Sequence, residues 1–212
     1  MKKLILTLIT PLFFMACSSP EDGQNLSNDD QKTDSTIINQ ELSKEELERY
    51  REIGIQYAST TQKALGQKLT QALSKGGAEH ALQFCNIQAM PITDSMANLH
   101  NAELSRVSDR PRNQSNTANA NELEQIAHFK QLLADGKVGA ELQPNIKIDG
   151  DQVHFYSPIV TNAMCLQCHG SKEEMIQPET LALISDLYPE DKATGYQANE
   201  VRGIWSIIFE KQ

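Results

Sequence analysis

The six residues CLQCHG, at positions 165–170, limit what this chain can fold into more than any other stretch of its sequence. Two cysteines separated by two residues and followed directly by a histidine form the C-x-x-C-H pattern, which is typical of covalent haem attachment. In that chemistry Cys165 and Cys168 form thioethers with the haem vinyl groups, and His169 becomes an axial ligand of the iron. The sequence therefore predicts a fold built around one covalent haem c.

Two other kinds of site also use a C-x-x-C pair. A redox disulfide of the thioredoxin type favours a βαβ context, and the hydrophobic pattern of this chain does not predict one. A structural zinc site needs two more ligands at regular spacing, which the sequence does not supply. Both alternatives remain open at this point, but covalent haem fits the histidine as well as the two thiols.

The N-terminus predicts export. Lys2 and Lys3 precede the apolar run LILTLITPLFFMA, which has the length of a signal-peptide core rather than of a membrane span. The run ends at FMAC, so residues 1–16 are predicted to be a lipoprotein signal peptide and Cys17 the lipidated first residue. A plain secretory signal cleaved near Ala16 is the alternative. We expect a lipoprotein in the cell envelope, anchored to a membrane and facing the periplasm or the cell exterior.

Composition then divides the rest of the chain. Residues 17–42 are rich in Ser, Asn, Asp and Gln and poor in large apolar side chains, which predicts a disordered tether. The remaining residues, 43–212, suit one domain. The formal net charge of −9 argues against nucleic acid or anionic lipid as a partner, because both attract basic surfaces.

Apolar periodicity predicts two helices at the start of the domain. Ser43 and Glu46 form a capping box, and apolar residues then recur at spacings of three and four up to Gly76 and Gly77. A second helix begins after these glycines, and Pro91 is expected to end or kink it. Its apolar, inward-facing stripe consists of Ala78, Ala81, Leu82, Cys85 and Ala89.

The remaining pattern mixes strands and helices. We expect a strand running into a polar loop at 102–116, a helix at 119–135, a hairpin about Asp149 and Gly150, a short helix at 178–186 and a last strand at 202–210. This order predicts an α+β domain with helices packed on a small antiparallel sheet. Four-helix cytochromes also carry C-x-x-C-H near the C-terminus, but that fold has no use for a hairpin or a closing strand.

Cys85 has no assigned role once the other three cysteines are used. A soft thiolate is a good partner for ferric iron, so Cys85 is a candidate second axial ligand. The alternative is a buried free cysteine that acts as a small apolar side chain. Other candidate ligands are the side chains of Met90, Met96, Met164, His80, His100, His128 and His154.

Six segments occur in a characteristic order: FCNIQAMPI, SRVSDRPRNQSN, NELEQIAHF, FYSPIVTNAMCLQCHG, YPEDKATGY and RGIWSI. With them the chain resembles the c-type haem family of PAS-like domains, long catalogued as a domain of unknown function and found also at the front of bacterial signalling proteins. Over residues 43–212 the resemblance implies a PAS-like antiparallel sheet flanked by helices. It also implies that Cys85 can bind the iron opposite His169. The chain departs from the family in RNQSNTANANE, which lacks the family's proline and tryptophan.

The resemblance further places a loop rich in arginine near the haem. Guanidinium groups pair well with propionate carboxylates, so Arg106, Arg110 and Arg112 are candidate propionate contacts. Tyr156 and Tyr188 are candidates for lining the pocket. A turn with a structural role is expected from Asp191, Gly195 and Tyr196.

These expectations favour one function over two others. A redox or small-gas sensor for NO or CO, acting through a partner protein, would use displacement of Cys85 to move its helix. The alternative is a periplasmic one-electron carrier that keeps both axial ligands. An enzyme would need acid or base groups beside an open iron, and the sequence shows no such constellation, so we do not expect an enzyme.

Overall fold

The structure, a computed structural model, describes residues 42–212. The predictions of a signal peptide at 1–16 and of a lipidated Cys17 lie outside the described residues, as does all of the predicted tether except Leu42. Among the helices of the described part, none combines the length and the apolar character needed to cross a membrane.

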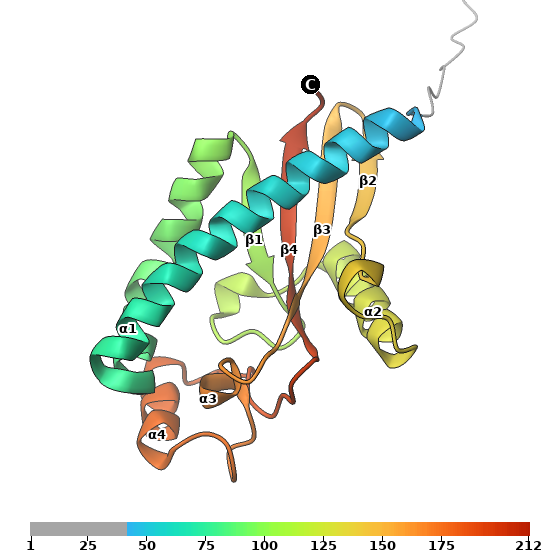
Figure 1. The fold of residues 1–212 in the computed structure, drawn as a ribbon. Coiled ribbons are helices and arrows are strands. Elements are labelled where there is room, and N and C mark those ends of the chain that lie inside the picture. The colour runs from blue at the N-terminus through green and yellow to red at the C-terminus, as the bar shows by residue number, and fades with distance from the viewer. Residues whose placement is uncertain (1–41) are drawn as a thin grey trace, which may run out of the picture. The chain divides into compact units, whose positions relative to one another are not determined.

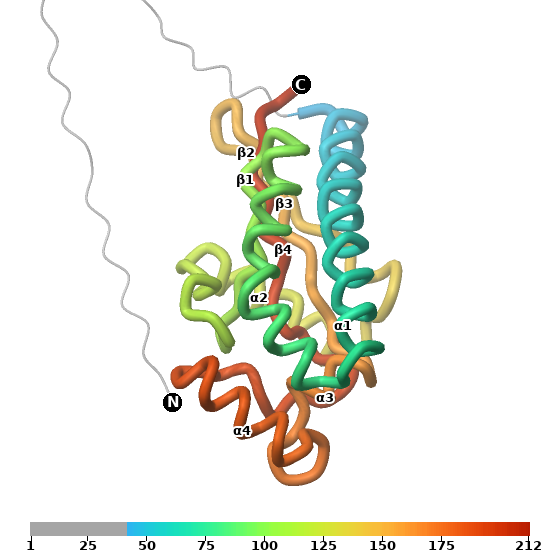
Figure 2. Tube along the Cα trace, turned by 90° about the vertical axis from the view of Figure 1, so that its left-hand side faces the viewer, coloured from blue at the N-terminus to red at the C-terminus, as the bar shows by residue number. Residues whose placement is uncertain are grey.

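The first element, α1 (Lys44–His100), begins as the sequence predicts. The Ser43 hydroxyl accepts the Glu46 N–H and the Glu46 carboxylate accepts the Ser43 N–H, which confirms the capping box. The backbone leaves the helical conformation at Gly76 and at Gly77, where φ is 68° and ψ is −159°. Glycine alone adopts this region readily. α1 therefore consists of two helical halves that run in opposite directions, as Figures 1 and 2 show.

The second half of α1 continues through Pro91 as far as His100, so the expectation that Pro91 ends the helix is wrong. Proline lacks the N–H that would bond the carbonyl of Ile87. Both Pro91 and Ile87 are exposed, so water can bond this carbonyl instead. The helix can then pass through Pro91 at a surface position.

Four strands form one antiparallel sheet in the order β1-β4-β3-β2. They are β1 (Glu103–Val107), β2 (Asn145–Asp149), β3 (Gln152–Val160) and β4 (Val201–Glu210). The hairpin predicted about Asp149 and Gly150 is confirmed, with Asp149 paired to Gln152 and Gly150 at a φ of 56°. The C-terminal strand β4 lies at the centre of the sheet, between β1 and β3.

The remaining helices are short. They are α2 (Ala120–Ala134), α3 (Leu166–His169), α4 (Pro178–Leu187) and the 3₁₀ turns η1 (Gln114–Asn116) and η2 (Gly139–Glu141). α2 and α4 confirm the predicted helices, and a second capping box between Asn119 and Glu122 starts α2. α3 was not expected from the sequence, because its single turn is too short to show a helical period.

Side chains alternate between the two faces of the sheet, and each face has its own helix. On one face Phe155, Trp205 and Ile207 pack with residues of α1, and on the other Ile204 packs with Phe129 of α2. α3 and α4 lie together beyond one end of the strands, next to the turn between the halves of α1 (Figure 1). The predicted α+β class, with a small antiparallel sheet flanked by helices and a long N-terminal helix, is confirmed.

Candidate functional site

The C-x-x-C-H segment forms the single turn α3 in the long connection between β3 and α4. His169 N donates to Cys165 O at 2.9 Å and Cys168 N donates to the same oxygen at 3.2 Å. The Asn162 carboxamide accepts the Met164 N–H at 2.9 Å and so caps the start of the turn. Residues three and four apart share a helix face, so Cys165, Cys168 and His169 form one group.

The ring of His169 is held by a backbone carbonyl. Its Nδ1 lies 2.7 Å from Ala193 O, and because a carbonyl only accepts, Nδ1 is assigned the proton and Nε2 keeps a free lone pair. Arg202 Nε also lies 3.3 Å from Nδ1, but it is a donor too and cannot bond a protonated nitrogen. Burial, and then the positive charges of Arg202 and Arg112, hold the pKa of His169 well below its usual value, so the imidazole is neutral.

The segment that supplies Ala193 lies along the C-x-x-C-H segment. Gly195 N donates to Gly170 O at 2.7 Å, and Tyr196 N donates to His169 O at 2.9 Å. Gly195 adopts a φ of 80°, a conformation that favours glycine. The chain bends at Gly195, within the segment where a turn was expected, and this segment also places a hydrogen-bond acceptor on His169, which the sequence did not predict.

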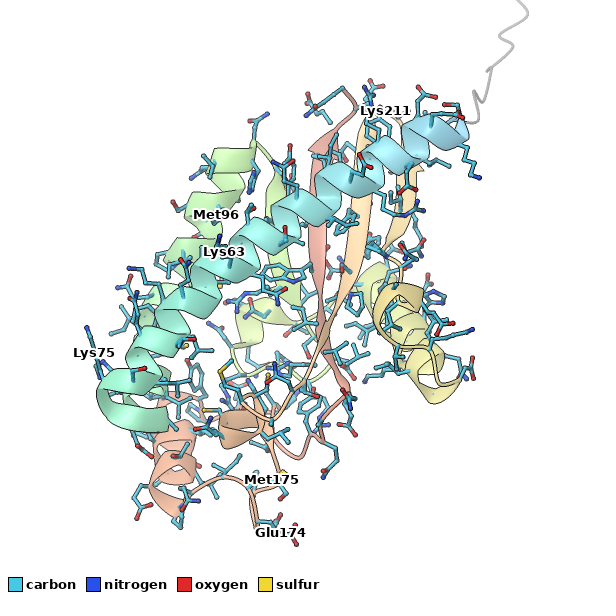
Figure 3. All side chains as sticks on the ribbon, viewed as in Figure 1. Lys63, Lys75, Met96, Glu174, Met175 and Lys211 are labelled. Carbon is cyan, nitrogen blue, oxygen red and sulfur yellow. The ribbon has the colours of Figure 1, made fainter. Side chains whose placement is uncertain are left out.

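Cys85 lies on the second half of α1, in the first turns after Gly77. Burial raises the pKa of its thiol, whereas Arg106 and Arg112 act in the opposite direction. Burial also raises the pKa of the Cys168 thiol, and the charge of Cys85 adds to this shift, so the two side chains are electrostatically coupled. Figure 3 shows sulfur atoms gathered at this end of the molecule, between α1, α3 and α4.

An apolar cluster encloses this region. Leu82 of α1, Ile184 of α4 and Ile176, which precedes α4, are buried together, and Cys168 and Tyr188 pack against them. Burial raises the pKa of the Tyr188 hydroxyl, and the charge of Cys85 adds to this effect. The structure thus brings Tyr188, predicted as a pocket residue, to the same region as both cysteines.

The three predicted arginines differ in what they bond. Arg106 lies on β1 opposite Trp205, and its buried Nε has no hydrogen-bond partner among residues 42–212. Arg110 donates from Nε to Lys192 O at 3.2 Å and from Nη2 to the carbonyl oxygen of Thr194. Arg112 bonds Cys168 and the segment after α4. The propionate role stays a prediction for all three, and Arg106 has the free donor.

Tyr156 is not brought to this region. Strand alternation sends Val153 and Phe155 to the face covered by α1 and sends Tyr156 to the opposite face, where it packs with Phe129 of α2. Burial, and then Glu122, raise the pKa of its hydroxyl. The interpretation of Tyr156 as a pocket residue is therefore corrected to a place in the core.

The rival iron ligands lie in several places. His100 stacks on Tyr57 at a ring-centroid distance of 4.3 Å, and His128 lies on α2. Met96 lies high on the second half of α1, away from α3 (Figure 3), and Met164 is exposed. Within residues 42–212 no three His, Cys, Asp or Glu side chains gather as a metal-ion site. Arg112 influences both Cys85 and His169, so these two predicted ligands share a charged neighbour.

Comparisons with known proteins concern the fold and the family of the chain. The crystal structure of the cyanobacterial heme-protein Tll0287 matches with a TM-score of 0.55 and 21% sequence identity, covering 81% of this chain and 98% of that chain. At that identity the match shows the fold alone. No curated protein sequence matches. The model of the Tll0287-like family matches residues 32–209, most of the sequence, and the chain therefore belongs to the Tll0287-like family.

Proposed function

We propose that this protein binds one covalent haem c, with Cys165 and Cys168 as the thioether residues and His169 as an axial ligand. The observation that carries the proposal is the bond from His169 Nδ1 to Ala193 O, which leaves Nε2 free on the turn that holds both thiols. A metal-bound histidine usually donates its second nitrogen in this way. The solved relative, described as a heme-protein, supports the same cofactor.

Other residues fit the same group. The half-buried Cys85 supplies a soft sulfur donor; burial raises the pKa of its thiol, and Arg106 acts in the opposite direction. The unpartnered Nε of Arg106 is a donor suited to a haem carboxylate. The apolar cluster of Leu82, Ile176 and Ile184 keeps water from this side of the site. These contacts support Cys85 as the second axial ligand and Arg106 as a propionate contact.

The proposed role is a redox or small-gas sensor that signals through a separate protein. A bound haem supplies an iron that exchanges one electron and can take NO or CO. Cys85 lies on the half of α1 that starts at the non-helical Gly76 and Gly77, so release of its sulfur removes a contact that holds this helix close to its hinge. His169 stays fixed by Ala193 while Cys85 is exchanged. This asymmetry supports a sensor in preference to an electron carrier.

The proposal also includes a location. We place the chain in the cell envelope, on the periplasmic or outer side, attached to a membrane through a lipid on Cys17. The signal-like run before Cys17 and the C-x-x-C-H segment both support export, because c-type haem is typical of exported proteins.

The test begins with the purified wild-type protein. Acid and organic extraction should leave the haem on the polypeptide, and the double variant Cys165→Ala, Cys168→Ala should lose it. The ferric protein should be low-spin with thiolate-type EPR features. Haem that is extracted from the wild type would overturn the central proposal.

Cys85→Ala then tests the second ligand, with Met96→Ala as the matched control on the same helical half. The Cys85 variant should lose the thiolate features and raise the reduction potential, because a thiolate stabilises ferric iron, whereas Met96→Ala should match the wild type. An unchanged spectrum in Cys85→Ala would return Cys85 to the core. Ferrous protein that binds CO supports the sensor, and rapid electron exchange without CO binding favours the carrier.

A further inference from the structure

A closed ring of contacts surrounds the proposed axial histidine. Arg112 Nε donates to Asp191 Oδ1 at 3.0 Å, and Asp191 Oδ1 accepts the Ala193 N–H at 3.0 Å. Ala193 O then accepts the Nδ1–H of His169 at 2.7 Å. The ring closes through the backbone, because Arg112 Nη2 donates at 2.6 Å to the carbonyl of Cys168, the residue before His169.

The ion pair in this ring is shielded from solvent. The side chains of Arg112 and Asp191 are only 10% and 7% exposed. A buried ion pair adds little net stability compared with apolar residues of the same size, because both charges must leave water. The geometry that this pair imposes on its neighbours explains its presence better than its contribution to stability.

Arg112 and Asp191 both bond Ala193, the residue that carries the acceptor on His169. Ala193 lies in a segment without helix or strand, so no regular ladder holds its carbonyl in place. The Asp191 carboxylate accepts the Ala193 N–H, and Arg112 donates both to that carboxylate and to Cys168 O. The same guanidinium thus bonds both the segment that carries the acceptor and the turn that carries the imidazole.

We propose that Arg112 and Asp191 are positioning residues that set the orientation of the His169 imidazole toward a haem iron, acting through the Ala193 carbonyl. The inference rests on the proposed function, since it needs His169 as an axial ligand. A fixed Nδ1–H bond stops the ring from turning about its χ2 torsion, so the Nε2 lone pair keeps one direction. Loss of such an outer partner typically weakens a metal–histidine bond roughly 10-fold to 100-fold.

The chain offers a matched control. Asp109 lies on the same stretch as Arg112 and pairs with Lys130 of α2 at 2.5 Å, with side chains 25% and 42% exposed. Within residues 42–212 this carboxylate forms no hydrogen bond with Ala193 or His169. Asp109→Ala therefore removes an ion pair from the same stretch without touching the ring.

The experiment uses ferric holoprotein labelled with ¹⁵N-histidine. Pulsed EPR follows replacement of the labelled histidine by added unlabelled imidazole in the wild type, Asp191→Ala, Asp191→Asn and Asp109→Ala. Covalent haem, read from colour that survives extraction, should be equal in all four. We expect Asp191→Ala to lose the ¹⁵N coupling at an imidazole concentration about tenfold lower than the wild type requires. Asp191→Asn, which keeps an oxygen acceptor for the Ala193 N–H, should lie closer to the wild type, and Asp109→Ala should match it.

The outcomes separate the inference from the function on which it rests. Wild type without covalent haem or without ¹⁵N coupling contradicts the proposed function. A second result is that all variants carry covalent haem while Asp191→Ala and the wild type lose the ¹⁵N coupling at the same imidazole concentration. That result overturns the positioning role alone. If Asp191→Ala does not fold, Arg112→Gln replaces it, because this change leaves the bond between Asp191 and Ala193 and removes the anchor to Cys168. A wild-type imidazole dependence in Arg112→Gln would likewise overturn the inference.

Discussion

Gly54 lets α1 approach the sheet closely. A Cβ atom at this position would overlap the ring of Phe155, which is fully buried in the core. Gly54→Ala should therefore lower the free energy of unfolding by about 1–3 kcal/mol, the usual cost of overpacking. Urea unfolding of the holoprotein measures this change.

Gly66 provides the control on the same helical half. A Cβ there meets nothing within 4 Å, and the residue lies inside the helix. Gly66→Ala should raise the free energy of unfolding by roughly 0.5–1 kcal/mol, because alanine loses less backbone entropy. An equal increase in the free energy of unfolding in Gly54→Ala and Gly66→Ala would show that α1 can move away from Phe155 without cost.

At the same scale, the sequence predicts those site residues that lie together in one short segment. Cys165, Cys168 and His169 lie on one helical turn, so their spacing alone predicts covalent haem attachment. The acceptor on His169 is a backbone oxygen of Ala193, and a backbone atom has no sequence signature. Asp191 could be predicted only as a turn residue, because its ion partner comes from a distant loop.

At the scale of elements, helix starts were predictable because capping is local, as the box formed by Ser43 and Glu46 shows. The strand order β1-β4-β3-β2 was not, because it pairs segments far apart in the chain. The sequence also could not show that the two halves of α1 pack side by side. That arrangement depends on tertiary contacts, among them those of His100.

His100 joins the end of α1 to its first half. Its ring stacks on Tyr57, and its Nε2 lies 2.8 Å from Thr60 Oγ1. That hydroxyl already donates to the Gln56 carbonyl, so it accepts from His100. Burial lowers the pKa of His100 below its usual value, which means that the folded protein favours the neutral ring.

This shift predicts how stability depends on pH. Between the ordinary histidine pKa of about 6.5 and the lower pKa in the fold, the unfolded chain binds more protons at His100 than the folded chain. The free energy of unfolding therefore falls as the pH falls through this window. His100→Gln lacks the titrating group, so urea unfolding should show a smaller loss from about pH 7 to about pH 5 than in the wild type. Parallel pH profiles would contradict the link.

At the scale of the whole molecule, the site forms only when distant parts of the chain have met. α1 supplies Cys85, the loop after β1 supplies Arg112, and the segment after α4 supplies Ala193 to the turn that holds His169. The sheet brings the last three of these segments together, because the adjacent strands β1, β4 and β3 lead directly into or out of them. A chain that has not folded therefore presents two thiols and a histidine but no oriented ligand.

The last prediction tests the proposal that a lipid on Cys17 anchors the chain to a membrane. A lipid on Cys17 adds about 0.8 kcal/mol of membrane affinity for each buried methylene group. The chain has a formal net charge of −9, so attraction to anionic lipids cannot replace that anchor. Cys17→Ser should therefore move the protein from the sedimented membranes of its host to the soluble envelope fraction, while the control Cys85→Ser sediments with the wild type. A Cys17→Ser protein that still sediments, or a wild type that is soluble, would contradict the lipid anchor.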